Sequence, residues 1–271
     1  MQRTIPPVMA ASLRIIPDLA ITLVLWTYYT AGFLVFFALW YLAAFPFAGW
    51  RETAYQRLNH FFYKGLFLLI RLLMPWRKLQ IHPDVKAVRS SVVVSNHLSY
   101  LDPLLLMSIY PRHKTIVKSG LFGIPVFGRM LKLSGYMPSE AKGDFADILI
   151  RQMNRMPAFL ASGGNLFIFP EGTRSRDGRL GEFNKGAFSI ARRHGAPIAV
   201  VRIRNTDQLF QPGRFLFHTC GGSPIRVDLM GILPPDRQGP SGSTSQVMEK
   251  VRQLLEPQTR NPGPADTAGP D

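Results

Sequence analysis

Residues 19–50 form the longest stretch of the chain without a charged side chain. This stretch is longer than the roughly 20 apolar residues that cross a bilayer. It also exceeds the apolar core of a cleavable secretory signal, which is about 7 to 15 residues long. We therefore predict an uncleaved membrane anchor that ends near Pro46 and Gly49. Gly32 lies close to the middle of the stretch, so a re-entrant hairpin is an alternative to a full span.

Residues 54–74 combine apolar side chains with a regular series of cations. Arg57, Lys64 and Arg71 recur every seven residues, which places them on one face of a helix. The pattern favours a helix that lies in the membrane surface with its cations on lipid phosphates. The alternative is a core helix with three solvated charges. Basic residues are more frequent after the anchor than before it. We therefore expect the protein to be anchored in the inner (cytoplasmic) membrane, with the following domain in the cytoplasm.

Short apolar runs alternate with helical stretches after Pro75, and this alternation predicts an α/β domain. We divide the chain into residues 1–78 (anchor and basic helix), 79–256 (catalytic domain) and 257–271, a tail whose composition is typical of disorder. The predicted strands are 92–94, 115–117, 166–169, 198–203 and 225–229. The predicted helices are 103–110, 144–161 with a break near Pro157, 185–194 and 246–255.

The predicted strand 92–94 stops at a polar turn that contains His97 and Asp102. Pro103 is favoured at the first position of a helix, so Asp102 is predicted to cap a helix that begins there. The turn between the two residues allows carboxylate and imidazole to meet. A carboxylate on one ring nitrogen would let the other nitrogen take a proton from a hydroxyl. A capping aspartate beside an unrelated histidine is the alternative on this stretch alone.

A second apolar strand, 166–169, runs into a turn that holds Glu171, Gly172, Thr173 and Arg174. Arg174 is suited to bind a phosphate through two hydrogen bonds, and the amides of Gly172 and Thr173 could line an anion site. A surface turn with solvated arginines is the alternative. Lys118 follows a third predicted strand, where it is either a cation of the same cleft or an exposed lysine beside a buried connection.

The composition indicates an anionic partner without identifying it. The chain has 271 residues, 32 Lys and Arg against 17 Asp and Glu, and a net charge of +15. Nucleic acid, a lipid surface and a phosphorylated substrate all fit this charge, but no recognisable nucleic-acid-binding signature is present. Cys220 is the single cysteine, which excludes an internal disulfide and a cysteine-rich metal site. We expect no metal site and no nucleic-acid partner.

Three motifs in order resemble the membrane-bound glycerolipid acyltransferases of the lysophosphatidic acid acyltransferase type, known in bacteria as PlsC-like enzymes. Asn96 and His97, followed after four residues by Asp102, match the family's catalytic His-x4-Asp motif. Residues 169–175 match its second signature, and residues 118–131 resemble its Lys-x-x-Leu-Phe-x-Ile-Pro-x-Phe-Gly block. The resemblance covers residues 79–206, and the order of the three blocks favours catalysis over capping for His97 and Asp102.

The resemblance implies a mixed sheet flanked by helices and an acyl transfer from acyl-ACP or acyl-CoA to a lysolipid, most simply 1-acyl-glycerol-3-phosphate. His97 would act as the general base on the lysolipid hydroxyl and Asp102 would orient it. Arg174 and Lys118, together with the Glu171 to Thr173 turn, would hold the acceptor phosphate, and amides near Gly172 would stabilise the oxyanion. No cofactor is implied beyond the thioester. The chain has no Gly-x-Ser-x-Gly elbow, which agrees with direct transfer.

One departure from the family pattern concerns the acceptor. Ala141 stands where the family usually has an arginine that helps to bind glycerol phosphate. Lys142 is a possible substitute, or the acceptor lacks glycerol phosphate, as a lyso-ornithine lipid does. A non-catalytic lipid-binding protein is a remote alternative. The choice of thioester, the acyl chain length and the oligomeric state stay open.

Overall fold

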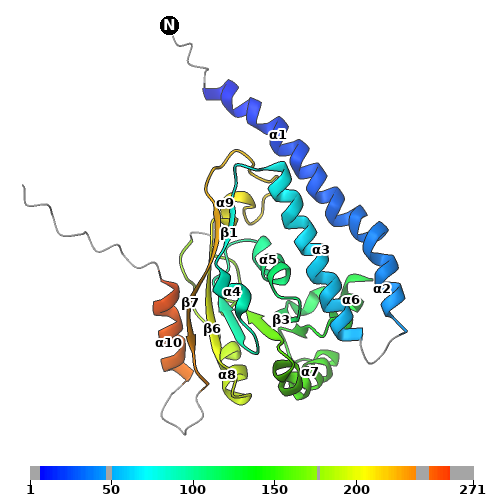
Figure 1. Cartoon of the computed structure of the whole chain (residues 1–271), viewed down its shortest axis with the longest axis vertical. Coiled ribbons are helices and arrows are strands. Elements are labelled where there is room, and N and C mark those ends of the chain that lie inside the picture. The colour runs from blue at the N-terminus through cyan, green and yellow to red at the C-terminus, as the bar shows by residue number, and fades with distance from the viewer. Residues whose placement is uncertain (1–6, 47–50, 176–177, 236–243, 257–271) are drawn as a thin grey trace, which may run out of the picture.

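The computed structural model describes residues 7–46, 51–175, 178–235 and 244–256 of the chain (Figure 1). A seven-stranded sheet has the order β1-β7-β6-β2-β5-β3-β4, and its neighbouring strands are parallel except for the antiparallel pair β6 and β7. The predicted mixed sheet is therefore confirmed. The predicted tail, 257–271, lies outside the described residues. The strands are β1 (Leu79–Ile81), β2 (Val92–Ser95), β3 (His113–Val117), β4 (Met137–Pro138), β5 (Asn165–Ile168), β6 (Ile198–Arg204) and β7 (Ile225–Leu233).

Helices cover both faces of the sheet, because alternate residues of the central strands point into two separate cores. Val93 and Phe167 pack with residues of α3 and α5, whereas Val92 and Leu166 pack with residues of α7, α8 and α10. The helices of this domain are α3 (Arg51–Leu73), α4 (Pro83–Ala87), α5 (Leu101–Ile109), α6 (Phe127–Leu133), α7 (Asp144–Ala161), α8 (Gly186–Arg193), α9 (Thr206–Leu209) and α10 (Thr244–Leu255).

The apolar stretch near the N-terminus forms one continuous helix. It comprises α1 (Pro7–Thr27), a π-helical segment (Tyr28–Phe37) and α2 (Ala38–Ala44). Within it, Ile15–Ala44 is long and apolar enough to cross a membrane. The helix passes through Gly32 without a turn, so the structure lacks the hairpin considered as an alternative. It ends at Ala44, just before Pro46, and Gly49 lies outside the described residues.

The apolar helix lies beside α3, as Figure 1 shows, and one glycine permits their close approach. The Tyr28 hydroxyl donates a hydrogen bond to the Phe62 carbonyl at 2.7 Å. A Cβ atom at Gly65 would lie only 2.3 Å from the Tyr28 hydroxyl. Gly65 therefore creates the space in which the tyrosine of the apolar helix reaches the α3 backbone.

The N-terminal end of α3 is joined to the sheet by an ion pair between a buried lysine and a partly exposed glutamate. Lys114 of β3 is fully buried, and its Nζ lies 2.7 Å from Oε1 of Glu52 and 2.7 Å from Oε1 of Gln152. Burial of the ammonium lowers the pKa of Lys114, and the carboxylate of Glu52 opposes this shift. Lys114 thus depends on Glu52 for its charge compensation.

We expect Glu52→Gln to lower the free energy of unfolding by roughly 3 kcal/mol, because it leaves the Lys114 ammonium buried without its counter-ion. Chemical unfolding of the detergent-solubilised protein measures this loss. The double variant Glu52→Gln with Lys114→Met removes both charges and is expected to recover part of it. An unchanged stability of the single variant would contradict the role given to this ion pair.

Candidate active site

The candidate site lies at the edge of the sheet where parallel strands β2, β5 and β3 end. Because these strands are neighbours and parallel, the residues that follow them meet at one edge. His97 follows β2, the turn with Glu171 and Arg174 follows β5, and Lys118 follows β3. The fold therefore collects the three sequence motifs on one side of the molecule.

His97 and Asp102 contact each other directly. Nδ1 of His97 lies 3.0 Å from Oδ2 of Asp102, whose side chain is fully buried. A carboxylate only accepts hydrogen bonds, so in the neutral form of the ring Nδ1 carries the proton and Nε2 carries the lone pair. The imidazole stacks on the Phe169 ring, with centroids 4.2 Å apart. His97 keeps 16% of its side chain exposed, which leaves the ring accessible to a substrate.

Asp102 does not cap a helix at Pro103, as the sequence had suggested. Helix α5 begins at Leu101, so Asp102 lies inside its first turn. Its Oδ2 accepts the amides of Leu98 at 2.6 Å and Ser99 at 2.7 Å, both of which precede the helix. A capping aspartate would instead accept amides that follow it. The carboxylate folds back onto the turn and holds its backbone around the histidine.

Thr206 completes the environment of the aspartate, and the sequence did not reveal it. Its hydroxyl donates to Oδ1 of Asp102 at 2.5 Å, and both side chains are buried. Thr206 begins α9 directly after β6, the strand on the other side of β2. The two residues are 104 positions apart, so no local motif joins them. The strand order alone brings them together.

Glu171 links the two turns of the site through their backbones. Its Oε1 accepts the amide of His97 at 3.0 Å, and its Oε2 accepts the amide of Gly181 at 3.0 Å. In return the amide of Ser175 donates to the carbonyl of His97 at 2.8 Å. Because each oxygen of Glu171 already accepts a backbone amide, the geometry supports a bracing role more than direct contact with an acceptor.

Arg174 lies over the ring of Tyr100, with its guanidinium carbon 3.4 Å from the ring centroid. Among the described residues, its Nη1 has no hydrogen-bond partner. This nitrogen is buried, and a buried guanidinium donor without an acceptor is a candidate contact for an anion. Gly172 has a positive φ of 68°, and its amide donates to the Phe169 carbonyl at 3.1 Å, so that amide closes the turn.

Lys118 and Ala141 lie on the same side of the sheet, after β3 and β4. Lys118, Ala141, Lys142 and Thr173 are all exposed. Within the described part of the chain, no hydrogen bond or ion pair joins Lys118 to His97 or Arg174. The segments after β3 and β4 are tied together by Ser119, whose hydroxyl accepts the amide of Glu140 at 3.0 Å.

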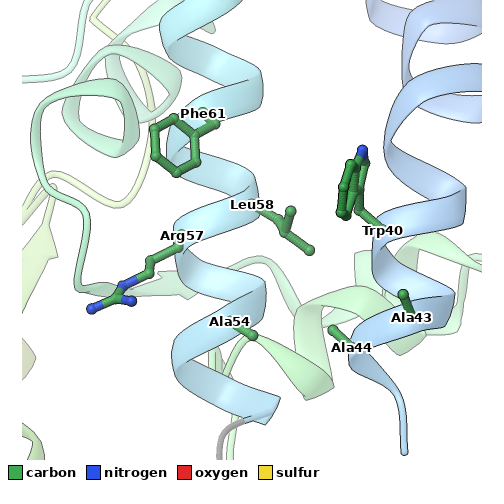
Figure 2. Close-up of a pocket in the computed structure, with 7 residues that line it drawn as sticks. All are labelled: Trp40, Ala43, Ala44, Ala54, Arg57, Leu58 and Phe61. Carbon is green, nitrogen blue, oxygen red and sulfur yellow. The ribbon is translucent and has the colours of Figure 1, made fainter. Parts of the chain in front are cut away.

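A second surface lies on the outer face of α3. Arg57, Lys64 and Arg71 are exposed there. Exposed apolar side chains share this face, namely Phe61, Leu68 and Leu72. A hollow of ≈ 510 Å³ opens between α2 and α3, where Trp40 and Leu58 face each other and Arg57 points away (Figure 2). The surface combines cations with apolar groups, as an interfacial helix does.

Comparisons with known proteins agree with this geometry. The acyltransferase family model matches residues 77–204. The 1-acyl-sn-glycerol-3-phosphate acyltransferase BAT2, chloroplastic, of Brassica napus is 36% identical over 149 residues, which are 51% of this chain and 43% of that protein. The corresponding LPAT1, chloroplastic, of Arabidopsis thaliana is 34% identical over 163 residues, 59% of this chain and 45% of that protein. This chain thus spans less than half the length of both plant relatives.

A solved structure shows the same fold. The crystal structure of the 1-acyl-sn-glycerophosphate acyltransferase PlsC from Thermotoga maritima superposes with a TM-score of 0.67 at 23% sequence identity. The superposition covers 89% of this chain and 94% of that chain. It therefore includes more of this chain than the sequence matches do.

Thr206→Val is expected to lower the free energy of unfolding by about 1 to 3 kcal/mol, because it removes a donor from a buried carboxylate. Thr206→Ser keeps the hydroxyl and serves as the matched control, with a smaller loss. Denaturant unfolding of both variants in detergent measures the difference. Equal stability of the valine and serine variants would show that the hydroxyl contributes nothing to holding Asp102.

Proposed function

We propose that this chain is a membrane glycerolipid acyltransferase of the lysophosphatidic acid acyltransferase type, and that it transfers an acyl chain from a thioester to a lysolipid hydroxyl. The observation that carries the proposal is the pairing of His97 with a fully buried Asp102 at 3.0 Å. Tyr100 and Arg174 lie in the two turns that meet there, so a cation stands beside the base. A base and an anion-binding group are the two elements that this reaction needs.

The proposed reaction proceeds by direct attack. Nε2 of His97 takes the proton of the lysolipid hydroxyl while the oxygen attacks the thioester carbonyl. The tetrahedral intermediate then collapses, the carbon–sulfur bond breaks, and the imidazolium returns its proton to the leaving thiolate. Asp102 stabilises the imidazolium between these two steps. No residue becomes acylated, and the thioester is the only co-substrate.

We assign acceptor binding to Arg174, assisted by Lys118. The curated relatives are named for 1-acyl-sn-glycerol-3-phosphate, so we propose that acceptor and phosphatidic acid as product. The amide of Gly172 is occupied within its turn, so the amide of Thr173 is the better candidate for the oxyanion. Ala141 supports the alternative of another lysolipid, such as a lyso-ornithine lipid. The thioester is either acyl-ACP or acyl-CoA.

We propose that the apolar helix and α3 hold the enzyme on the inner membrane, with the sheet on the cytoplasmic side. The length of Ile15–Ala44 and the exposed Arg57, Lys64 and Arg71 support this arrangement. Each cation near an anionic bilayer contributes about 1 kcal/mol to binding. The apolar hollow of Figure 2 lies on the same helix pair, where lipid chains would fill it.

His97→Ala is expected to lower kcat about 10² to 10⁴-fold, the contribution of a positioned general base. Transfer of a radiolabelled acyl chain from acyl-ACP and acyl-CoA to lysophosphatidate measures the loss. The variant must remain folded and membrane-bound, which circular dichroism and membrane flotation check. Transfer at the wild-type rate by this variant would refute the mechanism, and tight lipid binding without turnover by the wild type would favour a non-catalytic lipid-binding protein.

A panel of lysolipids offered with both thioesters tests the acceptor, with products read by mass spectrometry. We expect lysophosphatidate to have the highest kcat/KM. Arg174→Gln should raise the KM for this acceptor at least about tenfold, because a charge-assisted bond to the phosphate is lost. Preference for a lysolipid whose head group lacks glycerol phosphate would instead indicate that Ala141 is associated with a different acceptor specificity.

A further inference from the structure

The loop between α9 and β7 joins the apolar helix to the turn that carries His97. The Ser99 hydroxyl donates to the carbonyl of Phe210 at 2.6 Å. Near the middle of the loop, the amide of Phe217 donates to the Thr22 hydroxyl of α1 at 2.9 Å. The loop is thus attached at two points, at Phe210 to the active-site turn and at Phe217 to the helix that is apolar enough to cross a membrane.

Aromatic rings continue this connection without interruption. Arg174 lies on Tyr100, whose ring centroid is 6.1 Å from that of Phe210. Phe210 is 6.3 Å from Trp26 of α1, and Trp26 stacks on Phe215 at 5.7 Å with their planes 4° apart. We name Tyr100, Phe210, Trp26 and Phe215 the aromatic track.

The two end rings of the aromatic track, Tyr100 and Phe215, are open to a ligand, whereas Phe210 is buried at 6% exposure. Tyr100 is 50% exposed and Phe215 is 59% exposed, although both are large apolar rings. Leu19 and Leu23 are exposed on α1 and lie at helical spacing from Trp26, so the exposed apolar surface continues along that helix. One end of the track is therefore a cation, and its other end is a helix suited to a bilayer.

We propose that the aromatic track binds the acyl chain of the lysolipid acceptor while the acceptor phosphate lies on Arg174. This inference rests on the proposed function, in which Arg174 binds that phosphate. A lysolipid has one anionic end and one apolar chain, and the track presents the matching groups in the same order. Nη1 of Arg174 is buried without a hydrogen-bond partner among the described residues, and an acceptor phosphate oxygen would supply the missing acceptor.

The direction of the track also favours the acceptor over the thioester. A lysolipid resides in the membrane, and a chain lying along Trp26 and Phe215 would remain beside α1 while the head group reaches His97. The donor arrives on a soluble carrier and needs no continuous path from the membrane helix. If the effect of a substitution in the track depended on the chain length of the thioester, the donor chain rather than the acceptor chain would occupy the track.

Phe215→Ser tests the track in the full chain in mixed micelles. The hydrogen bond from Trp26 goes to the backbone carbonyl of Phe215, so the substitution removes the ring and retains this bond. Each buried methylene strengthens binding roughly fourfold, so we expect the KM for a long-chain lysophosphatidate to rise roughly tenfold at unchanged kcat. The KM for a short-chain lysophosphatidate and for each thioester should not change.

Ile232→Ser is the matched control, because Ile232 is an exposed apolar residue of β7 with a similar exposure of 53%. It should leave every kinetic constant unchanged. An unchanged KM in Phe215→Ser, an equal rise for short and long acceptors, or a rise that follows the donor chain would each overturn the proposal.

A binding measurement separates this proposal from the proposed function. Lysophosphatidate with a brominated chain should quench tryptophan fluorescence, and excess unbrominated lysophosphatidate should reverse the specific part. Trp26→Phe should lose most of that reversible quenching, whether or not any acceptor is turned over. Full reversible quenching in Trp26→Phe would exclude the track as the binding site. Absence of transfer by the wild type would refute the proposed function alone.

Discussion

The buried carboxylate of Asp102 is the constraint on which the candidate site depends. A carboxylate without solvent must be compensated by hydrogen-bond donors, and here they come from two parts of the chain. His97 contributes its ring nitrogen, the turn before α5 contributes the amides of Leu98 and Ser99, and Thr206 contributes a hydroxyl. Satisfying this one group fixes the turn, the direction of the imidazole and the position of the chain that leaves β6.

The sequence predicted the five longer strands because their apolar runs are bounded by polar turns. It missed β1 and β4, whose three and two residues are too few to show a pattern. It identified His97 and Asp102 from a strand end and a proline, yet placed Asp102 as a cap because Pro103 is a strong helix-start signal. The contacts of Thr206 with Asp102 and of Tyr100 with Arg174 could not be predicted from the sequence. The strand order produces the first contact, and stacking between two turns produces the second.

The apolar helix and the α/β domain share one hydrophobic core. Leu25 of α1 belongs to the same buried cluster as Phe67 of α3, Leu105 of α5 and Val93 of β2. Lys114 and Glu52 add an ionic link at one end of α3, and Gly65 admits Tyr28 near the middle of that helix. A disturbance of the apolar helix is therefore transmitted to the sheet through packed side chains rather than through a flexible linker.

The antiparallel strand β7 has a consequence for how the site can change. A further parallel strand after β6 would require a crossover helix that carries the chain to the opposite edge of the sheet. Because β7 returns directly, residues 205–224 stay at the edge where β2, β5 and β6 end. This connection contributes Thr206 at one end and the Trp26-facing rings further on. Phe210 and Phe217 of this connection are buried in the core, so a change in its length would alter the wall of the site while leaving the strand order unchanged.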